Sequence, residues 1–95
     1  MKLRLSRRAL DDLQSVYRQG VHQFGEQQAV SYQRALHEAF RFIAEFPEAN
    51  RVRTEFSKPY RIQRHEAHLI FYRVEKGEVY ITRIRHGHED WTADY

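Results

Sequence analysis

Apolar positions in the first half of the chain recur every three or four residues, the spacing of one face of an α-helix. Residues 7–24 show this spacing after Ser6, a good N-terminal cap, and before Gly25, a residue that helix C-termini favour. Residues 26–46 repeat it until Pro47, which stops a helix. Neither short helix can hide its apolar stripe from water by itself, so the pattern predicts a helical hairpin.

The second half of the chain is instead rich in aromatic and β-branched residues, in short runs that are typical of β-strands. These runs are residues 60–65, 67–74 and 78–86, with a hairpin turn at 75–77, and residues 2–6 alternate as a first strand. The run 67–74 is apolar on both faces, so we expect it at the centre of a sheet with both sides covered. The predicted fold is therefore α+β with the order β-α-α-β-β-β, a helical hairpin packed on a small antiparallel-rich sheet.

Composition predicts a single folded domain, residues 1–95, that ends in a short C-terminal tail at 87–95. Hydrophobic residues make up 41% and aromatic residues 14% of the chain, more than disordered proteins carry. No apolar run is long enough to span a membrane, and the N-terminus lacks the apolar segment of a signal peptide. We therefore expect a cytoplasmic protein with no membrane contact. The absence of cysteine excludes disulfides and thiolate metal sites.

The net charge of +3 hides an uneven distribution along the chain. Residues 47–88 hold nine Lys or Arg against five Asp or Glu, a sum of +4, whereas residues 89–95 hold three acids and no base. Arginine outnumbers lysine thirteen to three, and its guanidinium forms paired hydrogen bonds with phosphate or carboxylate. This pattern suits an anionic partner such as nucleic acid or an acidic protein segment, and it is equally ordinary for a domain without such a partner.

The stretch YITRIRHGHEDW, residues 80–91, concentrates residue types that bind metal or cleave RNA. His86 and His88 are close in sequence, but zinc needs about three aligned protein ligands, so we predict no metal and no other cofactor. Metal-free RNA cleavage needs a base, an acid and cations around the phosphate. Strand arginines are more often solvated edge residues, and the residue types alone leave the question open. The matching types are Arg61, Arg64, Arg73, Arg83, Arg85, His65, His68, His86 and His88.

Four segments that together span nearly the whole chain resemble the ParE branch of the RelE/ParE toxin superfamily, from bacterial type II toxin-antitoxin systems. They are LSRRALDDLQSVYRQ (5–19), HQFGEQQAVSYQRALHEAFRFIAEFPE (22–48), HLIFYRVEKGEV (68–79) and ITRIRHGHED (81–90). The last segment is similar to the family's strand that is followed by an arginine, a hydrophobic residue, a histidine and a nearby acid. No single segment is diagnostic, whereas their order and spacing together are.

The resemblance implies one of two mechanisms. RelE-type members are ribonucleases that cut messenger RNA in the ribosome with basic residues on the open sheet face, and ParE-type members bind DNA gyrase and block supercoiling. Leu69 stands where RelE-like sequences place an arginine that holds the phosphate, and Glu89 is near the position of another. Arg61 and Gln63 stand where those sequences place lysines. The loss of a cation beside a developing anion removes a strong contact, so we expect a gyrase inhibitor rather than an enzyme.

Two alternatives remain beside gyrase inhibition. One is a ribosome-dependent messenger RNA interferase, in which phosphate binding and proton transfer fall to Arg61, Arg83 and either His86 or His88. The other is a degenerate toxin that survives as a non-toxic binding module.

The resemblance also implies a cognate, ParD-like antitoxin that neutralises the toxin in a hetero-oligomer, and no sequence-specific contact with nucleic acid. Arginine and tryptophan are enriched at interface hot spots, and the residues that we select for gyrase binding are Arg83, Arg85, His86, Asp90 and Trp91. The antitoxin contacts that we expect are Tyr17, Tyr32, Leu69, Phe71, Val79 and Ile81. These apolar and aromatic residues could alternatively belong to the core, above all Val79 and Ile81.

Overall fold

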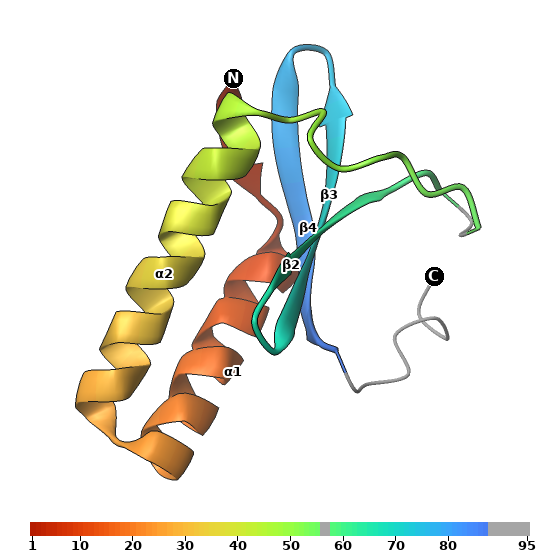
Figure 1. Cartoon of the computed structure of the whole chain (residues 1–95). Coiled ribbons are helices and arrows are strands. Elements are labelled where there is room, and N and C mark those ends of the chain that lie inside the picture. Colours follow the sequence, from red (N-terminus) through yellow and green to blue (C-terminus); the bar gives the residue numbers. More distant parts are fainter. Residues whose placement is uncertain (56–57, 88–95) are drawn as a thin grey trace.

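The structure is a computed structural model that describes residues 1–55 and 58–87 (Figure 1). Its elements are β1 (Lys2–Leu5), α1 (Arg7–Phe24), α2 (Glu26–Glu45), β2 (Arg61–His65), β3 (His68–Glu75) and β4 (Glu78–His86). This confirms the predicted order, and each boundary lies within one residue of the predicted one. The two helices lie side by side along one face of the sheet (Figure 1). No helix in the described ranges is long and apolar enough to cross a membrane.

The strands of the described residues form one sheet in the order β1-β4-β3-β2. β1 runs parallel to β4, whereas β4, β3 and β2 are antiparallel neighbours. The hairpin between β3 and β4 turns at Lys76 and Gly77, whose φ angles of 51° and 74° are typical of the two-residue turn that matches strand twist. Because β3 pairs with β4 on one side and with β2 on the other, it lies inside the sheet, as its apolar sequence predicts.

Gly25 joins the two helices with no further linker residue. Its φ of 91° lies in a region that favours glycine, and its N–H donates to the carbonyl of Val21 to close α1. Close to this turn the helices approach each other tightly, because a Cβ placed on Gly20 would lie 3.3 Å from the Cβ of Ala29. Small residues therefore set the helix spacing at the closed end of the hairpin.

Buried side chains form two clusters on opposite faces of β3. The main core lies between the hairpin and the sheet and consists of Ala9, Leu13, Leu36, Phe40 and Ile43 from the helices and Ile70, Tyr72, Val79, Ile81 and Ile84 from the strands. The smaller cluster lies on the opposite face and consists of Tyr60, Leu69 and Phe71, with Ile62 packed against them. Both clusters include residues of β3, which confirms that this strand is apolar and buried on its two faces.

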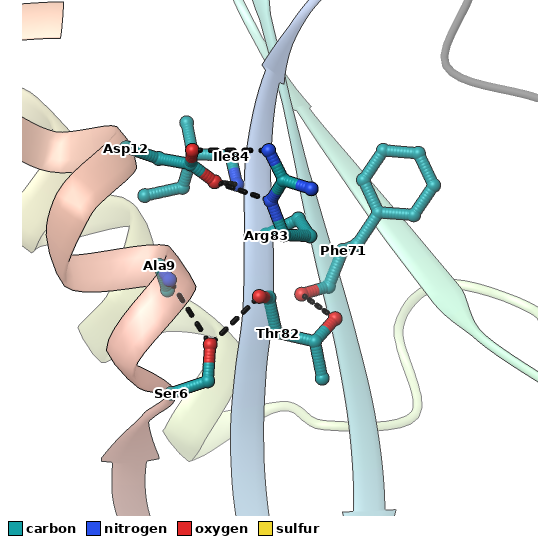
Figure 2. Close-up of polar contacts among 7 residues, drawn as sticks. All are labelled: Ser6, Ala9, Asp12, Phe71, Thr82, Arg83 and Ile84. Atoms are coloured by element: carbon teal, nitrogen blue, oxygen red, sulfur yellow. Dashed lines mark hydrogen bonds and ion pairs between the residues drawn. The ribbon is translucent and has the colours of Figure 1, made fainter. Parts of the chain in front are cut away.

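β4 carries a bulge at Thr82. Phe71 of β3 pairs with Arg83 and Tyr72 pairs with Ile81, so Thr82 has no opposite residue in the ladder. Its hydroxyl donates instead to the carbonyl of Phe71 at 3.1 Å (Figure 2). The extra residue shifts the alternation of side chains, so Ile81 before the bulge and Ile84 after it both face the main core.

Ser6 connects the start of α1 to this bulge (Figure 2). Its hydroxyl oxygen accepts the backbone N–H of Ala9 at 3.0 Å, which is the helix cap that the sequence predicts. The same hydroxyl donates to the carbonyl of Thr82 at 2.8 Å, and the backbone N–H of Ser6 donates to the carbonyl of Ile81 at 2.9 Å. One residue thus satisfies both a helix end and a strand edge.

We expect Ser6→Ala to lower the free energy of unfolding by about 0.5 to 2 kcal/mol, the usual range for loss of a helix cap. Ser6→Thr retains a hydroxyl and should lose much less, whereas Ser6→Asp keeps the cap acceptor but cannot donate to Thr82. Urea denaturation of these variants measures the differences. If the aspartate variant were as stable as the wild type, the contact with the bulge would contribute nothing.

Candidate interaction surfaces

The residues selected for target binding lie at and beyond the second half of β4. Arg85 is opposite Leu69 in the ladder to β3, and His86 is opposite His68. Because opposite residues share a face, Arg85 lies on the sheet face away from the hairpin and His86 lies on the hairpin side. The selected residues outside the described part of the chain are Asp90, Trp91 and, from the nuclease set, His88.

Arg83 is held by Asp12 of α1 (Figure 2). Its Nε and one terminal nitrogen donate to the two carboxylate oxygens at 2.8 and 3.2 Å, and the two side chains are only 13% and 16% exposed. The backbone N–H of Ile84 donates to the same carboxylate at 2.9 Å. β1 pairs with β4 only as far as Ile81, so Asp12 binds an edge N–H that β1 does not reach. The guanidinium of Arg83 therefore helps to hold α1 against β4, a contact that is called here the joint between α1 and β4.

Three histidines form a row across the end of the sheet, His65 on β2, His68 on β3 and His86 on β4. The rings of His68 and His86 meet edge to face with centroids 5.4 Å apart. Tyr32 of α2 packs on this row, and its ring centroid lies 5.5 Å from that of His65 and 5.4 Å from that of His68. Within residues 1–55 and 58–87, no three His, Asp or Glu side chains are placed to hold a metal ion.

The phenol of Tyr32 keeps its proton at neutral pH. Burial is the main cause that raises the pKa of Tyr32 to about 12, the negative charge of Glu66 also raises it, and a hydrogen bond with the backbone of Ala67 opposes them. The hydroxyl donates to the carbonyl oxygen of His65 at 3.2 Å and lies 2.7 Å from Nδ1 of His68, where the direction of the hydrogen bond depends on the imidazole tautomer. A protonated Nδ1 of His68 would donate to the hydroxyl while the hydroxyl donates to the carbonyl, so both contacts can be satisfied together.

The described members of the alternative nuclease set lie at two separate places. Arg61 is opposite Tyr72, on the hairpin side of β2, and donates to a backbone carbonyl in the loop after α2. His86 is opposite His68. Tyr72 and His68, the residues of β3 opposite Arg61 and His86, lie about 13 Å apart at the usual rise of a strand. Arg83 and His86 line one small pocket beside α1, whereas Arg61 lines another at the opposite edge of the sheet.

The residues expected to contact an antitoxin occupy different environments. Val79 and Ile81 are fully buried in the main core, which is the alternative that the sequence left open for them. Leu69 and Phe71 belong to the cluster on the other face of β3 and are 7% and 0% exposed. The partly exposed members, both on the helices, are Tyr17 and Tyr32.

A pocket of 310 Å³, here called the hairpin pocket, lies among the closed end of the hairpin, the turn between β2 and β3, and the end of β4. Among its lining residues the sequence singled out Tyr32, His68 and His86, but it gave no indication of a pocket. Its rim includes Gln19 and Gln28, and Phe24 at the end of α1 also lines it. The apolar stripe of α1 continues to Phe24 although the buried residues of this helix end at Leu13, a mismatch that only the structure reveals.

Known proteins are similar to this chain in sequence or in fold. The family model described as the ParE toxin of type II toxin-antitoxin system, parDE, matches residues 3–91. Toxin ParE1 of Caulobacter vibrioides is 35% identical over 83 residues, which cover 87% of this chain and 85% of that protein. A solved structure of a chromosomal ParDE TA system from P. aeruginosa has a TM-score of 0.78 and 24% identity, and covers 90% of this chain and 95% of that one. The last match concerns the fold alone.

We expect Asp12→Ala to lower the free energy of unfolding by about 3 kcal/mol, because it removes the carboxylate that binds both a largely buried guanidinium and the N–H of Ile84. Arg83→Met should cost less, since it leaves the N–H of Ile84 bound. A double-mutant cycle followed by urea denaturation should give a coupling of about 1 to 3 kcal/mol. A coupling near zero would show that the ion pair between Asp12 and Arg83 does not stabilise the contact between α1 and β4. Charge reversal at Arg83 consequently tests folding together with binding.

The raised pKa of Tyr32 predicts how stability changes in alkaline solution. The folded state holds the phenol proton more tightly than the unfolded state, so this contribution is fully present below pH 10.0 and is lost as pH rises through about 12. Tyr32→Phe should remove it, so the melting temperature of the variant should fall less steeply in that window. The phenolate absorbance of wild type minus variant should titrate near pH 12. A midpoint at the ordinary tyrosine pKa would contradict the assignment.

Proposed function

Because the chain belongs to the ParE toxin family of type II toxin-antitoxin systems, we propose that it arrests its host by inhibiting DNA gyrase. The observation that carries this choice over RNA cleavage is the apolar centre of the sheet face away from the hairpin. Leu69, at the position that the resemblance gives to a phosphate-holding arginine, is 7% exposed and clusters with Tyr60 and Phe71. A developing anion needs cations beside it, and a buried leucine offers none. Inhibition by binding needs no such site.

The proposed contact with gyrase is the end of β4 and the residues that follow it. Arg85 lies on the sheet face away from the hairpin, and His86 lies on the hairpin side. Asp90 and Trp91 complete the proposed set from outside the described residues. Arginine and tryptophan anchor many interfaces because they combine a large contact area with hydrogen bonds of fixed direction. Arg83 supports the contact by fixing the strand end through its ion pair with α1.

The proposed protein partner is a ParD-like antitoxin that binds the chain in a hetero-oligomer and neutralises it. Val79, Ile81 and Phe71 are left out of this interface because none of them has exposed surface. The excess of basic over acidic residues favours an acidic antitoxin segment. Gyrase acts on DNA in the cytoplasm, so the proposal places the protein there, and it requires no cofactor. The proposed contacts are Tyr17, Tyr32 and Leu69.

The purified chain should inhibit ATP-dependent supercoiling of relaxed plasmid by gyrase, and added antitoxin should restore it. Arg85→Glu should raise the concentration for half inhibition by about 10-fold, which corresponds to about 1.4 kcal/mol of binding. Arg34→Glu makes the same charge change at an exposed position of α2 and is the matched control, with potency unchanged. Gel separation of the topoisomers measures both.

The outcomes of this assay separate the candidate functions. Normal supercoiling together with cleavage of messenger RNA on translating ribosomes would replace gyrase inhibition by the interferase activity. If the chain neither inhibits supercoiling nor cleaves messenger RNA, the remaining candidate is a non-toxic binding module. Equal loss of potency in the Arg85 and Arg34 variants would remove Arg85 from the proposed contact.

A further inference from the structure

Positive charge is concentrated in one segment of the chain, residues 50–64, which is called here the basic edge. The basic edge holds five Lys or Arg and one Asp or Glu, a sum of +4, whereas the whole chain sums to +3. All other residues together therefore sum to −1. The segment comprises the end of the loop after α2 and most of β2, the edge strand of the sheet (Figure 1). The basic character of the protein is thus a property of one edge of the sheet.

Hydrogen bonds hold the loop part of the basic edge against the start of β2. The backbone N–H of Arg53 donates to the carbonyl of Tyr60 at 2.6 Å, and the N–H of Tyr60 donates to the carbonyl of Arg53 at 3.0 Å. The guanidinium of Arg61 donates to the carbonyl of Asn50. Because these contacts already fix the backbone at both places, a ligand of this edge does not have to order it first.

A pocket of 250 Å³, called here the β2 pocket, lies on the basic edge and extends to the end of β3. Lys58, Arg61 and Arg73 line it, and Glu75 is the acid among its described lining residues. Arg73 donates to Glu75 through one terminal nitrogen at 2.9 Å, while its buried Nε has no hydrogen-bond partner. Three cations beside a single carboxylate leave the β2 pocket with an excess of positive charge.

The size of the β2 pocket favours one group of a polymer over a free small molecule. Small-molecule sites begin at about 300 Å³, so a pocket of 250 Å³ does not enclose a nucleotide. A single phosphate group is small enough to enter, and lysine and arginine are the side chains that bind phosphate. A polymer of phosphates can place one group in the β2 pocket and its neighbours along the rest of the basic edge.

Apolar and aromatic groups on the basic edge offer little to a protein partner or to unpaired bases. In its described part the exposed large hydrophobic residue is Val52, whereas protein interfaces centre on an apolar patch. Tyr60 is 9% exposed, and the guanidinium of Arg73 lies 6.0 Å from its ring centroid. Single-stranded nucleic acid is bound by exposed rings on which bases stack. The edge therefore suits the backbone of a duplex, which proteins bind through lysine and arginine.

We propose that the basic edge binds the phosphate backbone of duplex DNA, with one phosphate in the β2 pocket. The contact is independent of base sequence, because every nucleotide carries the same phosphate. The choice of DNA over double-stranded RNA rests on the gyrase target proposed above, since gyrase acts on DNA. The basic edge then engages the duplex that gyrase holds. Binding itself needs no gyrase, so the two proposals are tested in separate samples.

The test titrates the full chain into a labelled DNA duplex of about 20 base pairs and follows fluorescence anisotropy between about 50 and 200 mM salt. Contact with about three phosphates should give a slope of about −2.7 for the logarithm of affinity against the logarithm of salt concentration. Lys58→Ala removes a cation of the β2 pocket and should reduce the slope by about 0.9 and the affinity at 50 mM salt by about 10-fold. Arg34→Ala removes one positive charge from an exposed position of α2 and should keep the wild-type slope.

A second pair of variants removes an arginine that is paired with a glutamate. Arg73→Met keeps an unbranched side chain beside Tyr60 but removes the guanidinium, and should reduce the slope by about 0.9. Arg41→Met is the matched control, because Arg41 of α2 donates to Glu38 at 2.9 Å as Arg73 donates to Glu75. This control should bind DNA as the wild type does.

Each outcome supports or overturns the proposal. Failure of the wild type to bind the duplex would overturn it, and so would wild-type slopes in the Lys58→Ala and Arg73→Met variants or equal losses in their controls. Tighter binding of a single strand, an RNA duplex or polyglutamate would assign the basic edge to that ligand instead. Thermal melts identify a variant that fails to fold; because Lys58 is exposed, its variant decides if Arg73→Met unfolds. DNA binding without inhibition of supercoiling would reject the gyrase target and retain the DNA contact.

Discussion

The joint between α1 and β4 is the contact on which the rest of the structure depends. β1 covers β4 only as far as Ile81, and Ser6 and Asp12 supply hydrogen bonds to the edge that continues beyond it. A strand edge and a helix end each carry backbone groups that need partners. Because one joint satisfies both, it also fixes where the hairpin lies on the sheet, and the main core can close between them. The bulge at Thr82 provides the carbonyl that Ser6 binds.

The burial of β3 on both faces determines where charged and polar side chains lie in this fold. Its side chains are divided between the main core and the cluster of Leu69 and Phe71, so the centre of the sheet is occupied by packing. Charged and hydrogen-bonding groups are displaced to the strand ends and edges, where Arg85 and the histidine row lie. The proposed action by surface contact is compatible with this division, because the described residues at the centre of the sheet are apolar.

Local signals in the sequence predicted the elements, because a helix stripe, the Ser6 cap, the Gly25 turn and an aromatic strand each depend on neighbouring residues. The joint could not be predicted in this way, since Asp12 and Arg83 are 71 positions apart and no local pattern specifies which acid meets which arginine. The bulge at Thr82 likewise depends on the register with β3. The histidine row and the hairpin pocket draw their members from several elements, so only the fold brings them together.

The parallel pairing of β1 with β4 has a consequence for the timing of synthesis. The helical hairpin consists of local contacts and can form as soon as residues 7–45 are made, whereas β1 finds its neighbour only after residues 78–86 have left the ribosome. A nascent chain or the translation product of a broken message therefore lacks a completed sheet. Any surface that depends on the pairing of β1 with β4 is therefore completed only when the chain is nearly finished.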